Sequence, residues 1–183
     1  MAPSNIQDVT KIIELDYGHT LPNHFGFCNQ IHGHRGRVEA TFRGEIVSNP
    51  KSSSQGMVMD FKEIKKIMME QIHDKLDHGF AVWKEDTSLL VVPVAGNDST
   101  QKVSMYITTL DFIKARNKKY LVTEEPPTAE YLSKWAFEQI NEGMRKYKQE
   151  HQDIKAPDLY RVRWYETPNS WADTYKLDRY GEI

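Results

Sequence analysis

The stretch RVEATFRGEIV, residues 37–47, alternates between apolar and polar side chains, and this pattern decides the kind of fold. Val38, Ala40 and Phe42 would point to one face of a strand, while the polar side chains between them would point to the other. A strand with one apolar face belongs to a sheet that is covered on that side only. We therefore expect antiparallel strands with helices on one face, which is an α+β fold.

Further strands are predicted on both sides of this stretch. VTKIIELDY (9–17) is rich in β-branched residues, and LYRVRWYET (159–167) alternates like a final strand. A short strand is expected at 57–60 and another at 88–94, within SLLVVPV. The run MYITTLDFIKARNK (105–118) has apolar residues at helical spacing, and we interpret it as a helix.

Two longer helices are predicted between the strands. Asp60, followed by Glu63, is an N-terminal capping signature, and the helical spacing that follows should stop at Gly79. The second helix spans about 128–148, with Thr128 as its cap. The length of 183 residues suits a single domain, 1–183, in which 81–125 forms an insertion or an elaborated connection.

The overall composition excludes several classes of protein. A formal charge of −2 argues against a general nucleic-acid binder, and no apolar stretch approaches the roughly 20 residues of a membrane span. The N-terminus lacks a basic start followed by an apolar run, so we expect no signal peptide. One cysteine cannot form an internal disulfide, which fits a cytoplasmic protein and makes the thiol a candidate for chemistry.

A metal site is predicted around HGH, residues 32–34. On a strand, side chains two apart point the same way, so His32 and His34 could present two imidazoles to one ion. A catalytic zinc commonly has three protein ligands and one open position. His19, at the end of the first strand, is the best third ligand, and His24 is the rival. Solvated histidines in an ordinary loop are the alternative.

An acid–base group is predicted at DH, residues 77–78. Asp77 could hold the His78 imidazole in one tautomer, and that imidazole could take a proton from Cys28. The alternative is a helix-end pair without a partner. Glu130 and Glu166 are further candidates, because a carboxylate accepts two parallel N–H groups from a guanidine-like edge. The alternatives are that Glu130 only stabilises the first turn of its helix and that Glu166 is only an exposed charge at a strand end.

Taken together, these segments resemble the 6-pyruvoyltetrahydropterin synthase family, in its 6-carboxytetrahydropterin synthase branch of queuosine biosynthesis. The segments that carry the resemblance lie in the family's order and cover most of the chain outside 81–125. They are LDYGH (15–19), CNQIHGHRGRVEATFRGE (28–45), GMVMDFKEIK (56–65), LDHGF (76–80), PTAEYLSKW (127–135) and RWYETP (163–168).

The resemblance implies the fold and the metal. The fold would be the tunnelling fold (T-fold), with a four-stranded antiparallel sheet and two helices on one face. Its copies would form an oligomeric barrel, usually a homohexamer built as a dimer of trimers. A zinc ion, Zn²⁺, would be held by His19, His32 and His34, which leaves His24 outside the site.

The resemblance also implies the roles of the other residues. Cys28 would be the proton-abstracting base, with Asp77 and His78 as its partners. Glu166 would anchor the amino-pyrimidine edge of a pterin. Two more side chains would line the same pocket, namely Thr128 and Glu130. The active site would lie between subunits, so that Cys28 and Glu166 could serve one pocket from different chains.

The implied reaction converts 7,8-dihydroneopterin triphosphate to 6-carboxytetrahydropterin, acetaldehyde and triphosphate. Three residues separate Cys28 from His32, and this short spacing resembles the carboxy branch more than the mammalian-type pyruvoyl enzymes. The alternatives are 6-pyruvoyltetrahydropterin formation or a dihydroneopterin aldolase activity at the same site. An alternative of another class is a zinc-stabilised binding protein that has lost the chemistry.

Overall fold

The computed structural model describes residues 5–95, 102–152 and 155–177. Four long or medium strands form the antiparallel part of the main sheet: β1 (Ile6–His19), β2 (His32–Glu45), β7 (Asp158–Thr167) and β8 (Ser170–Tyr175). Two short strands, β3 (Gly79–Trp83) and β6 (Tyr120–Thr123), extend the sheet beside β1 in parallel pairing. The order across the sheet is β6-β3-β1-β2-β7-β8.

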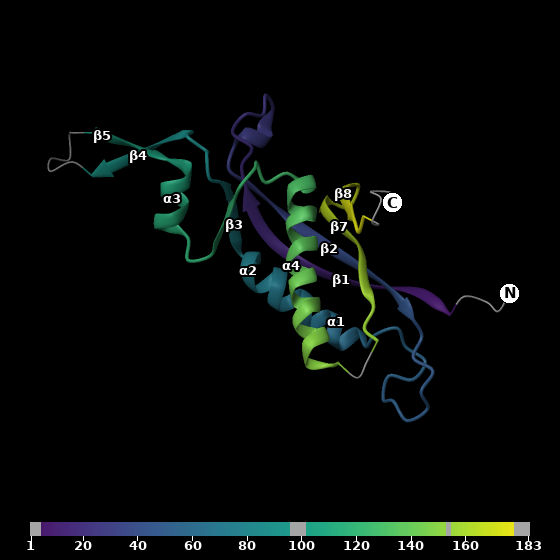
Figure 1. Cartoon of the computed structure of the whole chain (residues 1–183). Helices are drawn as coiled ribbons and strands as arrows, with labels where there is room; N and C mark the ends of the chain where they lie inside the picture. Colours follow the sequence, from purple (N-terminus) through teal and green to yellow (C-terminus); the bar gives the residue numbers. More distant parts are fainter. Residues whose placement is uncertain (1–4, 96–101, 153–154, 178–183) are drawn as a thin grey trace.

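Two helical segments cover one face of this sheet (Figure 1). The first consists of α1 (Phe61–Met68), the π-helical turn η2 (Met69–His73) and α2 (Asp74–Leu76). The second is α4 (Ala129–Glu150). Apolar side chains of the helices meet the apolar side of the sheet in one core, which includes Val38, Phe42, Ile72 and Ile140. The α+β class predicted from the alternation at 37–47 is therefore confirmed.

The predicted helix caps are present. The Asp60 side chain accepts a hydrogen bond from the Lys62 N–H, and the Thr128 hydroxyl accepts one from the Tyr131 N–H. These bonds satisfy backbone donors that the first turn of a helix leaves without intrahelical partners. The position of Thr128 also fixes the start of α4 beside the end of β1, a point that matters for the site.

The segment between β3 and β6 contains a separate two-stranded sheet. β4 (Leu89–Ala95) pairs with β5 (Lys102–Thr108), and α3 (Thr109–Arg116) follows directly. In Figure 1 this hairpin extends away from the main sheet. The prediction of one helix over 105–118 is wrong in its first half. Residues 105–108 pair with β4, and this cross-strand pairing outweighs the helical spacing.

Two other local predictions are wrong. Residues 57–60 form no strand; Val58 and Met59 instead point into the interior from an irregular connection, and both are 5% exposed. The first helix ends at Leu76 rather than at Gly79, because Asp77 and His78 leave the helix and Gly79 already belongs to β3. His78 takes the left-handed backbone conformation that glycine usually supplies, with φ of 56°. The strands β3, β6 and β8 were not predicted.

Candidate metal and catalytic site

Three histidines meet where β1 ends and β2 begins. His19 is the last residue of β1, and it pairs across the sheet with His32, the first residue of β2. His34 lies two residues further along β2 on the same face. One ligand atom from each imidazole lies within 4.8 Å of the other two. The Nε2 atoms of His19 and His34 are 3.1 Å apart, so both rings point to a common position.

Backbone carbonyls orient two of these rings. The Nδ1 atom of His19 lies 2.8 Å from the Pro127 carbonyl oxygen, and Nδ1 of His32 lies 2.8 Å from that of Gln30. If each Nδ1 carries the hydrogen and donates it, each Nε2 keeps its lone pair for a metal ion. Metal-binding histidines commonly have such carbonyl partners. The donor set therefore fits a first-row divalent ion such as zinc.

The electrostatics also favour neutral imidazoles. Burial lowers the pKa of His19 to about 4, because only 1% of this residue is exposed and a charged ring would lose its water. Burial also lowers the pKa of His34, with a smaller contribution from His32. A metal ion competes with protons for the same nitrogen, so low pKa values leave these ligands available at neutral pH. His24 lies outside this cluster, in the loop that follows β1, where its Nδ1 accepts a hydrogen bond from the Gly26 N–H.

Cys28 lies in the same loop, within a single turn of 3-10 helix, η1 (Phe27–Asn29). Its side chain is partly exposed. Its backbone carbonyl accepts a hydrogen bond from the Leu21 N–H, which closes the base of the loop. Among the residues that the structure describes, none hydrogen-bonds to the thiol, and this includes Asp77 and His78.

Asp77 and His78 form a hydrogen-bonded pair beside β1. One carboxylate oxygen of Asp77 accepts from the Asp16 N–H at 2.9 Å, and the other lies 2.7 Å from Nδ1 of His78. Burial alone would raise the pKa of Asp77, but the hydrogen bonds from Asp16 and His78 outweigh it and hold that pKa below its usual value. The His78 side chain is 79% exposed. His78 and His34 line one open pocket of about 350 Å³.

The predicted substrate residues lie beside the histidines. Thr128 directly follows Pro127, whose carbonyl orients His19. Burial raises the pKa of Glu166, the nearby charge of Glu130 raises it further, and His32 acts in the opposite direction. Arg37 pairs with Tyr165, so Glu166 lies at the end of β7 that runs beside the histidine end of β2. The fold thus brings together the imidazoles, two carboxylates and the start of α4 from four separate elements.

One aromatic pair at this site was not anticipated. Tyr17 contacts His19 and His34, with ring centroids 5.5 and 5.9 Å apart, and its hydroxyl accepts a hydrogen bond from Trp164. The available signal was its spacing, since a residue two before His19 on a strand shares its face.

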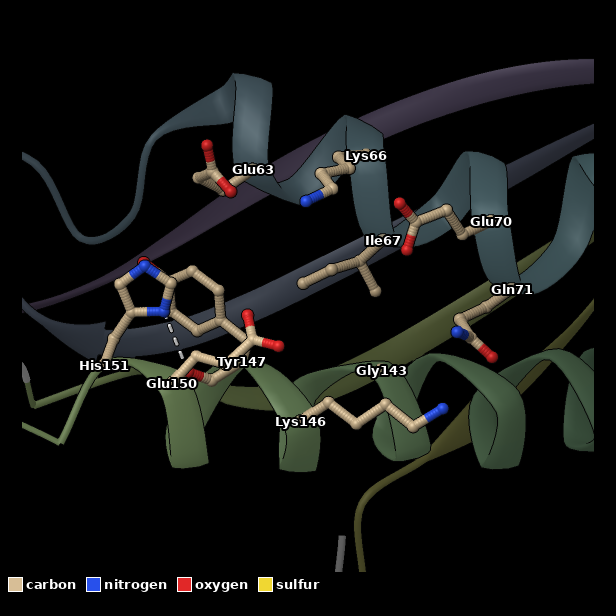
Figure 2. A pocket seen from close by; sticks show the side chains of 10 residues that line it. All are labelled: Glu63, Lys66, Ile67, Glu70, Gln71, Gly143, Lys146, Tyr147, Glu150 and His151. Atoms are coloured by element: carbon tan, nitrogen blue, oxygen red, sulfur yellow. Dashed lines mark hydrogen bonds between the residues drawn. The ribbon is translucent and has the colours of Figure 1, made fainter.

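A second pocket, of about 370 Å³, lies between α1, η2 and α4 (Figure 2). Charged side chains of both signs project into it, among them Glu70 from η2 and Lys146 from α4. Gly143 forms part of its lining and lets the two helical segments approach closely. None of the predicted site residues lines this pocket, so we treat it as a surface groove of the helical layer.

Comparison with known proteins identifies the family. The sequence model of the family described as 6-pyruvoyl tetrahydropterin synthase matches residues 8–176. The chain belongs to this family. Its enzymes are tetrahydropterin synthases, which are lyases. The tunnelling fold predicted from the resemblance is accordingly confirmed, with β3 and β6 added to the expected four antiparallel strands.

Individual relatives support this assignment. The chain is 24% identical over 165 residues to the 6-carboxy-5,6,7,8-tetrahydropterin synthase of Haemophilus influenzae, covering 90% of this chain and 96% of the relative. It is 29% identical over 178 residues to a Pyrococcus horikoshii protein provisionally given the same name, covering 95% and 88%. The Plasmodium falciparum 6-pyruvoyl tetrahydropterin synthase structure shares the fold, with a TM-score of 0.61 at 17% identity over 94% and 99% of the two chains. No helix in the described part of the chain has the length and apolar character needed to cross a membrane.

Proposed function

We propose that the protein is a zinc-dependent 6-carboxy-5,6,7,8-tetrahydropterin synthase of the queuosine pathway. The observation that carries this proposal is the convergence of His19, His32 and His34 on one position with Glu166 beside them. The names of the relatives favour the carboxy reaction over the pyruvoyl reaction. The substrate would be 7,8-dihydroneopterin triphosphate, which with water yields 6-carboxytetrahydropterin, acetaldehyde and triphosphate.

The proposed roles follow from the chemistry of each side chain. Glu166 would accept the two N–H groups of the amino-pyrimidine edge, and Thr128 and Glu130 would line the pocket around it. A bound zinc ion would polarise the side-chain oxygens of the substrate. Those oxygens would then lie between the imidazoles and the base.

Cys28 would remove a proton from the substrate side chain as a thiolate. The His78–Asp77 pair would receive that proton, because the Asp77 carboxylate stabilises the imidazolium form of His78. Within one chain, no hydrogen bond joins the described Cys28 thiol to either of them. We therefore propose that the complete pocket forms between copies of the chain in a homo-oligomer, for which a hexamer is the expected form.

The test is product analysis with a matched variant. Zinc-loaded protein and 7,8-dihydroneopterin triphosphate should yield carboxytetrahydropterin by mass spectrometry, with an equal amount of acetaldehyde. Cys28→Ala should abolish turnover while the zinc content, measured by atomic absorption, stays at the wild-type level. His24→Gln should keep both. A pyruvoyl product would assign the chain to the sibling reaction, and full activity in Cys28→Ala would refute the role of the thiolate.

A further inference from the structure

The ring of Tyr17 contacts His19 and His34 and reaches β7, the strand that carries Glu166. Tyr17 and His19 project from the same side of β1, and the Tyr17 ring extends across β2 over Gly36. A Cβ atom at Gly36 would lie 2.8 Å from Cε1 of Tyr17 and 3.2 Å from the Tyr165 carbonyl oxygen. The absence of a side chain at Gly36 therefore opens the path by which Tyr17 reaches β7, the strand that carries Glu166.

Trp164 holds the Tyr17 hydroxyl in place. The indole N–H of Trp164 donates to the hydroxyl oxygen at 3.0 Å, and the two residues are 0% and 4% exposed respectively. The hydroxyl also carries a hydrogen of its own. Within the described residues, that hydrogen has no acceptor. A buried donor without an acceptor is costly, and such groups in folded proteins call for an explanation.

Glu166 supplies the complementary group close by. Arg37 pairs with Tyr165 across the sheet, so Glu166, the next residue of β7, lies beside Gly36, over which the Tyr17 ring extends. Like the Tyr17 hydrogen, the Glu166 carboxylate has no hydrogen-bond partner in the part of the chain that the structure describes. The site therefore presents an unused acceptor and an unused donor on one face of the sheet, around Gly36.

This pattern matches one class of heterocycle. A 2-amino-4-oxopyrimidine presents two adjacent N–H donors and, next to them, a carbonyl acceptor. A carboxylate can take both N–H groups, and a neighbouring hydroxyl can donate to the carbonyl oxygen. A 2,4-diaminopyrimidine has an amino group in place of that carbonyl, so it offers the Tyr17 hydrogen no acceptor at the same position.

We propose that the Tyr17 hydroxyl donates to the 4-oxo oxygen of the heterocycle that Glu166 anchors, and that this bond selects 4-oxo over 4-amino pteridines. The inference rests on the proposed function, because it assumes a pterin in this pocket. It makes Tyr17 a residue that determines specificity, whereas the histidines and Cys28 serve the reaction.

Equilibrium binding of two probes tests this directly. 6-Hydroxymethylpterin and 2,4-diamino-6-hydroxymethylpteridine differ at position 4 and in the N3 hydrogen, which the neutral diamino ring lacks. Calorimetry measures the affinity of the zinc-loaded protein for each. The wild type should prefer the 4-oxo probe, because both the Tyr17 and the Glu166 contacts favour it. Tyr17→Phe should reduce this preference by about three- to tenfold, which is the contribution of one neutral hydrogen bond, by weakening the 4-oxo probe alone.

Two further variants make the test decisive. Tyr165→Phe makes the same change on the other face of β7, where the hydroxyl contacts Arg163, and it should keep the wild-type preference. Trp164→Phe removes the N–H that holds Tyr17, so it should reduce the preference even if Tyr17→Phe fails to fold. An unchanged preference in Tyr17→Phe, or an equal loss of affinity for both probes, would overturn the assignment. If the wild type binds neither probe, the proposed function itself is wrong.

Discussion

Replacing His19 with glutamine should remove part of the acid sensitivity of the metal-free protein. In the native state burial lowers the pKa of His19 from 6.5 to about 4, whereas the unfolded chain restores the ordinary value. Above the unfolded pKa both states hold a neutral ring, and His19 adds no pH dependence. As the pH falls below the unfolded pKa, the unfolded chain binds a proton at His19 and the native state does not. The native state therefore loses stability until the pH reaches the folded pKa.

The magnitude follows from the size of the change. One pKa unit corresponds to about 1.36 kcal/mol, so a shift from 6.5 to about 4 costs roughly 3 kcal/mol of unfolding free energy. Glutamine does not titrate, so it keeps a neutral polar side chain at this position over the whole interval. As the pH falls from the unfolded to the folded pKa of His19, the variant should therefore lose about 3 kcal/mol less unfolding free energy than the wild type.

Equilibrium urea unfolding of the chelator-treated protein measures the free energy of unfolding. It is carried out at one protein concentration and at several pH values between the folded and the unfolded pKa of His19. His24→Gln is the matched control, because His24 lies in the loop outside the cluster, and it should retain the wild-type pH dependence. An identical loss of stability in His19→Gln and wild type would show that His19 is not a buried neutral imidazole in solution.

Three other predictions concern separate parts of the structure. Gly143→Ala should lower the free energy of unfolding by about 1 kcal/mol, because the new Cβ would lie 2.6 Å from Cγ2 of buried Ile67. This crowding exceeds the gain in helix propensity, and a higher Tm in thermal unfolding would contradict it. Thr128→Ala removes the cap of α4, so it should lower the free energy of unfolding by about 1 kcal/mol and also weaken pterin binding. The control is Thr108→Ala, which removes the cap of α3 and should lower the stability only. Equal pterin affinities in both variants would place Thr128 outside the pocket. Glu166→Gln should raise KM by about tenfold or more, because a charge-assisted pair becomes a neutral one, and an unchanged KM would exclude Glu166 as the anchor.

Local sequence patterns predicted the long elements well. Alternation predicted β2 and β7, and β-branched residues predicted β1. Capping with helical spacing predicted the starts of α1 and α4. These signals lie within a few neighbouring residues. The short strands β3, β6 and β8 carry little pattern of their own and depend on a neighbouring strand for pairing. The same dependence explains 105–108, whose residues become a strand because β4 lies alongside.

The sequence by itself determined which chemical groups are present and which of them share a face. His32 and His34 point together because a strand repeats every two residues, and the chain contains the carboxylates and the thiol that the proposed reaction uses. Only the tertiary structure decided which groups meet. His19 joins the cluster through the β1–β2 register and is held by the carbonyl of Pro127, 108 residues away. Tyr17 comes near Glu166 because Gly36 leaves room for its ring. Such contacts depend on strand register and on the space that distant residues leave, and neither is encoded in a local pattern.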